Sequence, residues 1–375
     1  MQSAARNDII GLMKNMIGSF RVKGLRSLQD VELKDLGRVN AFVGRNGAGK
    51  TTLLEAFYLF FSCATLESII GIAERRGEYD KTDGTGLWTP SVRHFFAGHA
   101  LKKGHDLALL SSDGLDVSFS IGEENMPLKD DYRIVRPTTM CHISRGNGNE
   151  GWSGLSFPIC KSGAIDSDYT GDGGYKRVLA PDDVPVAFVD PDGMSASALL
   201  KMRDEVVSRG DERKLVKALK LLDPRVESVG FLSADEKTYK FLANGTMVGL
   251  AGLSGRVPVK TLGDGMRRLL VIAMAIVCVR GGALILDEVD SGLHYSAMES
   301  LWEFIYKAAE ANDVQVFAST HSLDCLRGLA ALCEASQAAC EAVRLYSLSD
   351  SGKRVVSYCG HDMSMAVNSE IEVRA

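Results

Sequence analysis

Hydrophobic and polar positions near the start of the chain alternate in short runs and then change to a helical spacing. The runs SFRVKGL, DVEL and RVNAFV within residues 18–43 predict short β-strands. Residues 52–64, TLLEAFYLFFSCA, are apolar enough to predict a buried helix. The sequence therefore predicts a strand, a glycine-rich connection and a helix in succession.

The middle of the chain has a different character. Residues 71–190 are rich in Gly, Asp and Ser, with strand-like runs such as DVSFSI between them, and predict a loop-rich, β-leaning insertion. Residues 195–222 return to a helical spacing that ends before Asp223-Pro224, and residues 226–260 predict a β-hairpin region.

The last third of the chain alternates helices with strands. LGDGMRRLLVIAMAIVCV, residues 262–279, is apolar on nearly all sides and predicts a buried helix. GGALILDE, the amphipathic stretch LHYSAMESLWEFIYKAAEAN and VQVFAST predict a βαβ unit with parallel strands. Residues 341–358 predict a hairpin that turns at Asp350-Ser351-Gly352.

Composition and charge exclude few classes of protein. The 375 residues are 45% hydrophobic and 24% charged, with a net charge of −5, so contact with nucleic acid would need a local basic patch. The eight cysteines form no C-x-x-C pair, and we expect reduced thiols. No export signal is recognised, and the longest apolar run, residues 269–279, is too short to cross a bilayer. We therefore expect a cytoplasmic protein with no membrane contact.

The connection after the third predicted strand carries the first candidate chemistry. Residues 44–51, GRNGAGKT, fit the pattern G-x-x-x-x-G-K-[ST] between a strand and a helix. Glycines let backbone N–H groups face an anion, and the following helix adds its own unsatisfied N–H groups. Lys50 would place its charge on the β- and γ-phosphates, and the Thr51 hydroxyl is a hard ligand for Mg²⁺. This pattern predicts a nucleoside triphosphate such as ATP, held by Gly44, Asn46, Gly47, Ala48, Gly49, Lys50, Thr51 and Thr52.

Two later strands end in residues that suit the same chemistry. ALILDE ends in Asp287, which would hold Mg²⁺ through water, and in Glu288, which would polarise the attacking water. VQVFAST is followed by His321, which would contact the γ-phosphate as a sensor. An acidic strand end facing solvent explains one carboxylate more easily than this pair. Ligands bind at the carboxyl edge of a parallel sheet, so we expect the three strand ends to converge there.

Together these segments resemble the ABC-type branch of P-loop ATPases, the SMC, RecF and OLD-like proteins often labelled AAA family ATPases. LGDGMRRLL resembles their signature motif, ALILDE the Walker B strand, VDSGLH the D-loop and STHS the switch segment. The resemblance covers residues 18–64 and 195–375, and residues 71–190 only by position. It implies an α/β P-loop NTPase fold of ABC/SMC head type: a mixed, mostly parallel sheet, an antiparallel β subdomain and a small helical insertion.

On this resemblance the chain divides into four segments. Residues 1–70 would form the N-terminal half of the ATPase lobe with Walker A, and residues 71–190 the β-leaning insertion. Residues 191–260 would form a helical insertion and a hairpin. Residues 261–375 would form the C-terminal half with the signature, Walker B, D-loop and switch histidine.

The signature segment departs from the transporter-like pattern at Asp264, which stands where that pattern has glycine. A carboxylate beside a triphosphate would be repelled, so we expect Asp264 to cap the helix by accepting from the N–H of Met266 or Arg267. We expect Arg267 or its neighbour Arg268 to turn toward the nucleotide or the dimer interface. The resemblance implies that the signature approaches the nucleotide of a second copy through Gly263, Asp264, Gly265 and Arg267.

Two further positions follow from the comparison with the family. Arg21 falls where the family often has a nucleotide-contacting arginine. The family also has a glutamine that links the metal site to the inserted domain, and no Gln lies between Lys50 and the signature. His94 lies at a plausible place, although a helix-end or surface histidine explains it more simply.

The resemblance implies a Mg²⁺-dependent ATPase that dimerises, or forms a larger homo-oligomer, around ATP and gates a separate effector or nuclease, as in bacterial anti-phage defence. Too few residues follow His321 for the nuclease domain of OLD proteins. The main alternative is a RecF- or SMC-like clamp that binds DNA, for which the basic clusters are modest. These clusters are Arg75-Arg76, Lys102-Lys103, Lys176-Arg177 and Arg267-Arg268.

Two other classes fit the sequence less well. A transporter's nucleotide-binding subunit is disfavoured by the missing glutamine, by Asp264 and by the large insertion. A Ser/His/Asp hydrolase would need a G-x-S-x-G elbow, which the chain lacks.

Overall fold

The structure is a computed structural model that describes residues 16–83, 85–102, 106–112, 114–127, 135–146, 153–166, 184–232, 245–349 and 352–374. The chain divides into two compact units. The first, which we call the antiparallel unit, takes residues 1–36, 46–183 and 348–355. The second, the parallel unit, takes residues 37–45, 184–347 and 356–375. The chain passes from one unit to the other inside the glycine loop, between Arg45 and Asn46.

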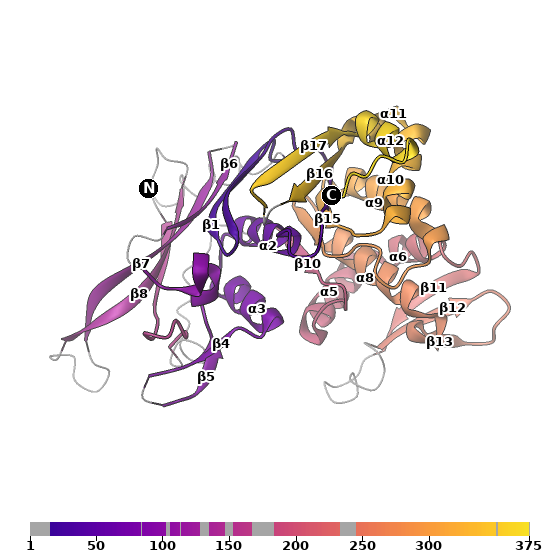
Figure 1. The fold of residues 1–375 in the computed structure, drawn as a ribbon. Coiled ribbons are helices and arrows are strands. Elements are labelled where there is room, and N and C mark those ends of the chain that lie inside the picture. Colours follow the sequence, from indigo (N-terminus) through magenta and orange to yellow (C-terminus); the bar gives the residue numbers. More distant parts are fainter. Residues whose placement is uncertain are drawn as a thin grey trace, which may run out of the picture. The chain divides into compact units, whose positions relative to one another are not determined.

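A six-stranded antiparallel sheet forms the body of the antiparallel unit, and its long strands β7 and β8 are drawn in magenta in Figure 1. The strands at residues 107–158 extend the sheet of β1 and β2, because β6 pairs with β1 in the register Phe20↔Ser111. The predicted insertion therefore shares one sheet with the start of the chain. The strand order is β2 (Leu28–Leu33), β1 (Phe20–Leu25), β6 (Leu107–Ser111), β7 (Asp116–Pro127), β8 (Val135–Gly146) and β9 (Ser153–Pro158).

Helix α2 (Lys50–Phe61) follows the glycine loop and packs against this sheet through aromatic rings. The ring of Phe20 on β1 stacks on Phe57 at 4.3 Å between centroids and meets Phe60 edge-on at 5.3 Å. The helix predicted at residues 52–64 is confirmed, although it ends earlier because Cys63 and Ala64 adopt positive φ values of 52° and 45°.

A second helix and two short strands complete the antiparallel unit after α2. Thr65 caps α3 by accepting from Ser68 N, and Gly77 ends that helix with φ of +66°. The elements that follow α2 are α3 (Leu66–Arg76), β4 (Tyr79–Lys81), β5 (Trp88–Pro90) and the 3₁₀ turns η1 (Arg93–Phe95) and η2 (Ala97–His99).

The parallel unit is built on a second six-stranded sheet, in which five consecutive strands are parallel. Strand β3 lies in the interior of this sheet between β15 and β16, and the Asn40 side chain donates to Val316 O, 276 residues along the chain, at 3.2 Å. The predicted βαβ unit is confirmed, with α9 between β14 and β15. The strand order is β10 (Val186–Val189), β14 (Ala283–Leu286), β15 (Gln315–Ser319), β3 (Val39–Val43), β16 (Val343–Ser349) and β17 (Arg354–Cys359).

Helices and a small sheet pack around the parallel sheet, and Figure 1 shows the helices near the C-terminus grouped in orange and yellow. Helix α8 is buried along most of its length, as its apolar pattern predicts. The helical stretch at residues 195–222 breaks into α5 and α6 at Gly210, whose φ is +67°. The helices are α5 (Ala196–Arg209), α6 (Glu212–Leu219), α8 (Asp264–Cys278), α9 (Met298–Asn312), α10 (Leu323–Ala335), α11 (Gln337–Ala342) and α12 (Gly360–Asn368), with 3₁₀ turns η4 (Val259–Leu262) and η5 (Tyr295–Ala297).

The predicted hairpin region consists of β11 (Val226–Phe231), β12 (Thr246–Leu250) and β13 (Arg256–Pro258), which form a three-stranded antiparallel sheet. Residues 233–244 of that region lie outside the described residues, as do Lys103, Lys176-Arg177 and the turn residues Asp350-Ser351. In the part of the chain that the structure describes, no helix is long and apolar enough to cross a membrane. All eight cysteines are described, and each is a free thiol.

Candidate functional site

The glycine loop is shaped by positions that only glycine fills without strain. Gly49 has a φ of +97°, and a Cβ there would lie 2.8 Å from Leu28 Cδ2. Gly47 has a φ of +79°, in the left-handed region that L side chains rarely adopt. The loop can therefore bring its backbone close to a ligand.

Helix α2 begins at the end of this loop with features that suit an anion. Gly49 is its N-cap, no side chain caps the first turn, and that turn contains no acidic residue. The N–H groups and positive dipole end of such a helix attract phosphate. Lys50 in the first turn is only 5% exposed, and a buried ammonium is stabilised by an anionic partner. The nucleotide-binding roles of the loop residues remain predictions.

The carboxyl ends of β3, β14 and β15 lie side by side in the parallel sheet, because β15 pairs with both other strands in parallel. The expected convergence of the three strand ends is therefore present. At this edge Asp287 is 6% exposed, and Ser319 at the end of β15 donates its hydroxyl to Asp287 Oδ1 at 2.5 Å. Sequence reasoning missed this role of Ser319, although a buried polar residue at the carboxyl end of a strand signals it.

Glu288 adopts a backbone conformation that is rare for a residue other than glycine, with φ of +46°. Its N–H donates to Ser319 Oγ at 2.9 Å, which fixes the turn after β14. The Glu288 side chain is exposed at the sheet edge, where it can reach solvent. Strained backbone of this kind is often found at functional sites.

Arg268 holds the same turn from behind. Only 3% of this residue is exposed, and its Nη2 donates to the carbonyl oxygens of Asp287 at 2.8 Å and Glu288 at 3.1 Å. Its Nη1 donates to the carbonyl oxygen of Asp190, which follows β10. Burial, followed by repulsion from Arg267, lowers the pKa of Arg268 to about 10, so the guanidinium is still charged at neutral pH. Arg268 therefore does not turn toward the nucleotide or a dimer interface, which was one of the two expectations for the signature arginines. Its place among the apolar residues of α8 indicates burial.

His321 follows β15 and is partly exposed. Its carbonyl oxygen accepts from Arg374 Nη1 at 3.1 Å, so the end of the chain supports the switch segment. The neighbouring Thr320 donates to Asp290 Oδ1 at 2.5 Å. The Arg374 side chain also hydrogen-bonds Glu372 and lowers the pKa of that carboxyl to about 2. The catalytic role of His321 is not tested by these contacts and stays a prediction.

The signature segment corrects one expectation. Gly263 is the N-cap of α8, with no side-chain cap, and Asp264 is the first helical residue. Asp264 therefore does not cap the helix, and its side chain is 72% exposed with Arg267 Nε at 3.7 Å. Gly265 lies against the D-loop, where a Cβ would approach Gly292 O at 3.2 Å. Gly263 and Asp264 are exposed at the surface of the parallel unit.

Two other predicted residues lie in the antiparallel unit. Arg21 makes two hydrogen bonds of 2.7 Å to the Asp30 carboxylate on the next strand, and these contacts give it a structural role. His94 in η1 places Nε2 3.7 Å from Asp80 Oδ2 and Nδ1 3.2 Å from His99 Nδ1. Desolvation lowers the pKa of His94. Whether Arg21 or His94 takes part in nucleotide binding remains untested.

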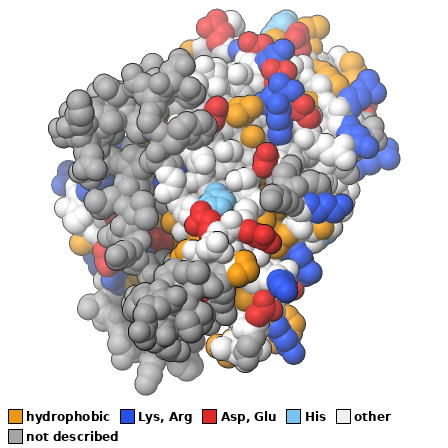
Figure 2. Space-filling model, turned by 90° about the vertical axis from the view of Figure 1, so that its left-hand side faces the viewer, with side chains coloured by type: hydrophobic (Ala, Val, Ile, Leu, Met, Phe, Trp, Pro, Cys, Tyr) orange, Lys and Arg blue, Asp and Glu red, His pale blue; other side chains and the backbone are white. Residues whose placement is uncertain are grey.

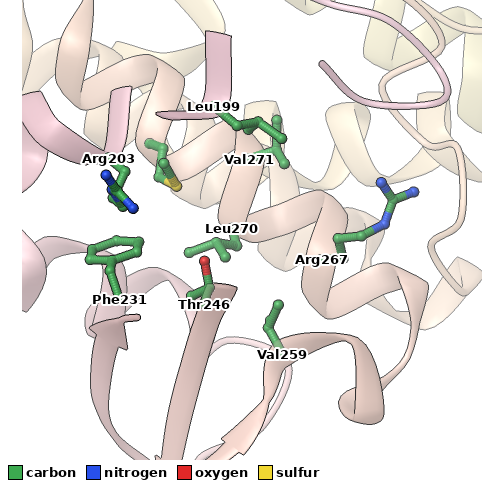
Figure 3. Close-up of a pocket in the computed structure, with 9 residues that line it drawn as sticks. Leu199, Arg203, Phe231, Thr246, Val259, Arg267, Leu270 and Val271 are labelled. Atoms are coloured by element: carbon green, nitrogen blue, oxygen red, sulfur yellow. The ribbon is translucent and has the colours of Figure 1, made fainter. Parts of the chain in front are cut away.

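Arg267 also lines a pocket between α5, α8 and the sheet of β11 and β12, shown in Figure 3. Most of the lining is apolar, and Thr246 and Arg203 supply the other polar groups. Arg203 is paired with Asp204 at 2.6 Å. Among the described residues of the lining there is no carboxylate or histidine for acid–base chemistry, so the sheet edge is the better candidate for catalysis.

The described surface does not present one continuous basic area in the view of Figure 2, where Lys and Arg side chains alternate with Asp and Glu. Arg75 lies over the Tyr58 ring at 5.4 Å, and Arg76 pairs with Glu55 at 2.7 Å. The first basic cluster therefore makes contacts within its own unit.

Two family models match the chain at the segments that carry these motifs. A model described as "AAA ATPase domain" matches residues 16–106, and one described as "AAA domain, putative AbiEii toxin, Type IV TA system" matches residues 204–326. The glycine loop, the acidic strand end and these matches agree, and they indicate AAA-type ATPase domains in this chain. The chain is an ATP-hydrolysing enzyme with an α/β fold that combines a mostly parallel sheet with antiparallel sheets, as the sequence predicts.

Individual relatives and a solved structure extend this comparison. The chain is 23% identical over 330 residues to a Helicobacter pylori protein named "ATP/GTP phosphatase", covering 82% of this chain and 85% of that one. Over 42 residues it is 48% identical to the DNA replication and repair protein RecF of Coxiella burnetii, which is 11% of this chain and 12% of RecF. An SMC head bound to the C-terminal winged-helix domain of ScpA aligns over 92% of this chain and 97% of that one, with 15% identity and a TM-score of 0.47.

Proposed function

We propose that this ATPase is a nucleotide-dependent switch that dimerises around ATP and gates a separate effector or nuclease in bacterial anti-phage defence. The single observation that carries this proposal is the exposed amino end of α8, where Gly263 and Asp264 face outward instead of contacting the strand ends of their own unit. The N–H groups at a helix start attract phosphate, and Arg267 Nε, 3.7 Å from the Asp264 carboxylate, would offset the repulsion from that carboxylate when the helix meets the nucleotide of a second copy. One matching family is described as a putative AbiEii toxin of a type IV toxin–antitoxin system, and this description supports the link to defence.

We infer the following roles at the strand edge. Lys50 and the loop N–H groups would bind the β- and γ-phosphates, and Glu288 would accept a proton from the attacking water. His321 would hydrogen-bond the γ-phosphate. These groups would raise the rate by holding water and phosphate in line rather than by covalent chemistry.

Asp287 in the parallel unit, whose carboxylate Ser319 orients, and Thr51 in the antiparallel unit would each offer a hard oxygen donor to a magnesium ion. Magnesium, when bound, would neutralise negative charge on the phosphates. Chelation by EDTA should therefore stop hydrolysis, and added Mg²⁺ should restore it.

The decisive experiment combines nucleotide binding with measurement of mass in solution. Lys50→Ala should abolish tight ATP binding, measured with a fluorescent ATP analogue. The wild-type protein with a nonhydrolysable analogue should have twice the monomer mass by light scattering, and Lys50→Ala should not. Unchanged affinity in Lys50→Ala would disprove the loop assignment, whereas binding without a mass change would disprove the dimer.

A RecF-like DNA clamp remains the second candidate, favoured by the short but close match to RecF. That protein is named for DNA replication and repair, and the matched 42 residues cover only a small part of it. Affinity for duplex DNA that requires ATP and falls steeply with salt would support the clamp. Absence of such binding at low salt would exclude it.

A further inference from the structure

A cluster of four charged side chains connects α2 to neighbouring elements of the antiparallel unit. Glu55 on α2 is 3% exposed, and its carboxylate lies 3.2 Å from Arg26 Nε and 2.7 Å from Arg76 Nε. Arg26 also pairs with Glu78, with Nη2 and Oε2 2.9 Å apart. Two carboxylates and two guanidinium groups therefore compensate one another in a largely buried place.

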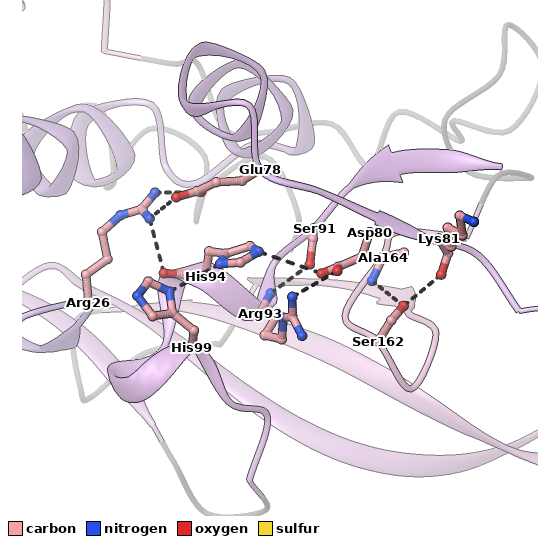
Figure 4. A network of polar contacts seen from close by, with 10 residues as sticks. All are labelled: Arg26, Glu78, Asp80, Lys81, Ser91, Arg93, His94, His99, Ser162 and Ala164. Atoms are coloured by element: carbon pink, nitrogen blue, oxygen red, sulfur yellow. Dashed lines mark hydrogen bonds and ion pairs between the residues drawn. The ribbon is translucent and has the colours of Figure 1, made fainter. Parts of the chain in front are cut away.

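Arg26 is the centre of this cluster, and Figure 4 shows its side chain reaching both Glu78 and His94. It occupies the turn between β1 and β2 with φ of +52°. Its Nη1 donates to His94 O at 3.2 Å, and its backbone N–H donates to Phe95 O at 2.9 Å. The guanidinium lies 5.1 Å from the centre of the Phe95 ring, close enough for a cation–π contact.

Such a cluster needs a reason beyond stability. Buried ion pairs give little net stability, because desolvation offsets most of their attraction, and similar apolar side chains often serve as well. In this cluster we infer that the ion pairs supply a fixed geometry. Here the fixed element is α2, which begins at Lys50, and Glu55 lies on the same short helix.

We propose that Glu55 and Arg26 are positioning residues for ATP hydrolysis. The contact between Glu55 and Arg26 fixes α2 against the segment from Glu78 to His99. Nucleotide bound at the glycine loop and the conformation of that segment therefore influence each other. This inference rests on the proposed nucleotide site at Lys50. It predicts that residues 78–81 and 93–99 of the antiparallel unit respond to bound ATP.

The test is Glu55→Gln, which keeps the side-chain shape and removes the charge. We expect kcat for ATP to fall about 10- to 100-fold, because misplacement of a distant support can cost that much. KM for ATP should change little. Hydrogen exchange should show that ATP protects the amides of Glu78–Lys81 and Arg93–His99 in the wild-type protein and not in Glu55→Gln.

A control is Glu124→Gln, the same chemical change in the same unit. Glu124 on β7 lies 3.8 Å from His142 on β8, outside the segment from Glu78 to His99. Glu124→Gln should keep kcat near the wild-type value. An equal loss of kcat in both variants, or normal turnover in Glu55→Gln, would overturn the proposal.

Glu55→Gln leaves one excess buried positive charge and so lowers stability. The double variant Glu55→Gln/Arg76→Gln removes that excess, and its melting temperature should recover. If kcat recovers as well, the cluster serves stability alone and the proposal is wrong. If the wild-type protein shows no ATP-dependent protection at the loop itself, and Lys50→Ala behaves identically, the proposed nucleotide site fails instead.

Discussion

The strand-end edge of the parallel unit and the amino end of α8 both carry an aspartate that the family resemblance marks, yet the two are held very differently. Asp287 is 6% exposed, accepts from Ser319 and has its carbonyl oxygen bound by Arg268. Asp264 has a side chain that is 72% exposed and only a 3.7 Å contact with Arg267. One carboxylate is fixed by its own unit, and the other is presented to solvent.

This difference follows from what each group has to contact. A residue that orients water or metal within its own chain must be held to within a fraction of an ångström, and hydrogen bonds from behind provide that precision. A residue that meets a second molecule gains its contacts only on association. The comparison therefore suggests that mutations at the strand edge change chemistry and stability, whereas mutations at the α8 end change association.

The largest effect is expected at Glu288. Glu288→Gln should lower kcat about 10²- to 10⁴-fold, because a general base contributes that much to catalysis. ATP binding should persist, and ATP-bound dimers should accumulate, as measured by light scattering. Glu303→Gln is the control, since Glu303 forms an exposed pair with Lys307 on α9. Normal turnover in Glu288→Gln would remove this residue from the mechanism.

Arg268→Met should produce the largest loss of stability. It would leave the buried carbonyl oxygens of Asp190, Asp287 and Glu288 without this donor, at a cost of about 3 kcal/mol or more. Chemical denaturation measures the change. Arg267→Met is the neighbouring control, with an expected loss below about 1 kcal/mol because its contacts are partly exposed. Equal losses in the two variants would contradict the role of Arg268.

Ser319→Ala tests the brace between the two strand ends. The Glu288 N–H would lose its hydrogen-bond partner, which also supports the positive φ of Glu288. We therefore expect the free energy of unfolding to fall by about 1–3 kcal/mol. Turnover should also fall. Ser336→Ala removes a cap of α11 and should cost about 1 kcal/mol with normal turnover. If both variants lose turnover in proportion to stability, Ser319 has no specific role.

The smallest effect is expected at Asp264. Asp264→Asn removes a charge from the first turn of α8 and should change stability by less than about 1 kcal/mol. If repulsion opposes association, ATP-dependent dimerisation should become tighter in sedimentation experiments. A loss of several kcal/mol would show that Asp264 supports the helix in a way these contacts do not explain.

The sequence was most informative where the spacing of apolar residues and a phosphate-binding motif point to the same element. The glycine loop, the apolar helix at residues 262–279 and the strands ending at Leu286 and Ser319 are where the patterns predict them. Local signals sufficed because parallel strands flanked by helices are apolar throughout and end in polar residues. The amphipathic pattern after the D-loop predicts a helix from Leu293, but α9 begins only at Met298, because Tyr295–Ala297 forms a 3₁₀ turn before it.

Long-range contacts could not be predicted from these patterns. Arg268 reaches the carbonyl oxygens of two separate strand ends, and Arg26 connects α2 to a segment more than fifty residues away in sequence. Helical spacing shows that a charged residue is buried but not which group compensates it. The cap at Asp264 was wrong because Gly263 already occupies the capping position, with φ of +96°.

The interior place of β3 has a consequence for how the protein is made. Asn40 on β3 hydrogen-bonds Val316 on β15, which is synthesised 276 residues later, so β3 cannot pair with β15 until then. At about 5–20 residues per second, a ribosome needs about 14–55 s to supply it. During synthesis the strand that leads into the ATP-binding loop stays unpaired in its sheet, so a chain cut short before β15 should not bind ATP, however intact its glycine motif.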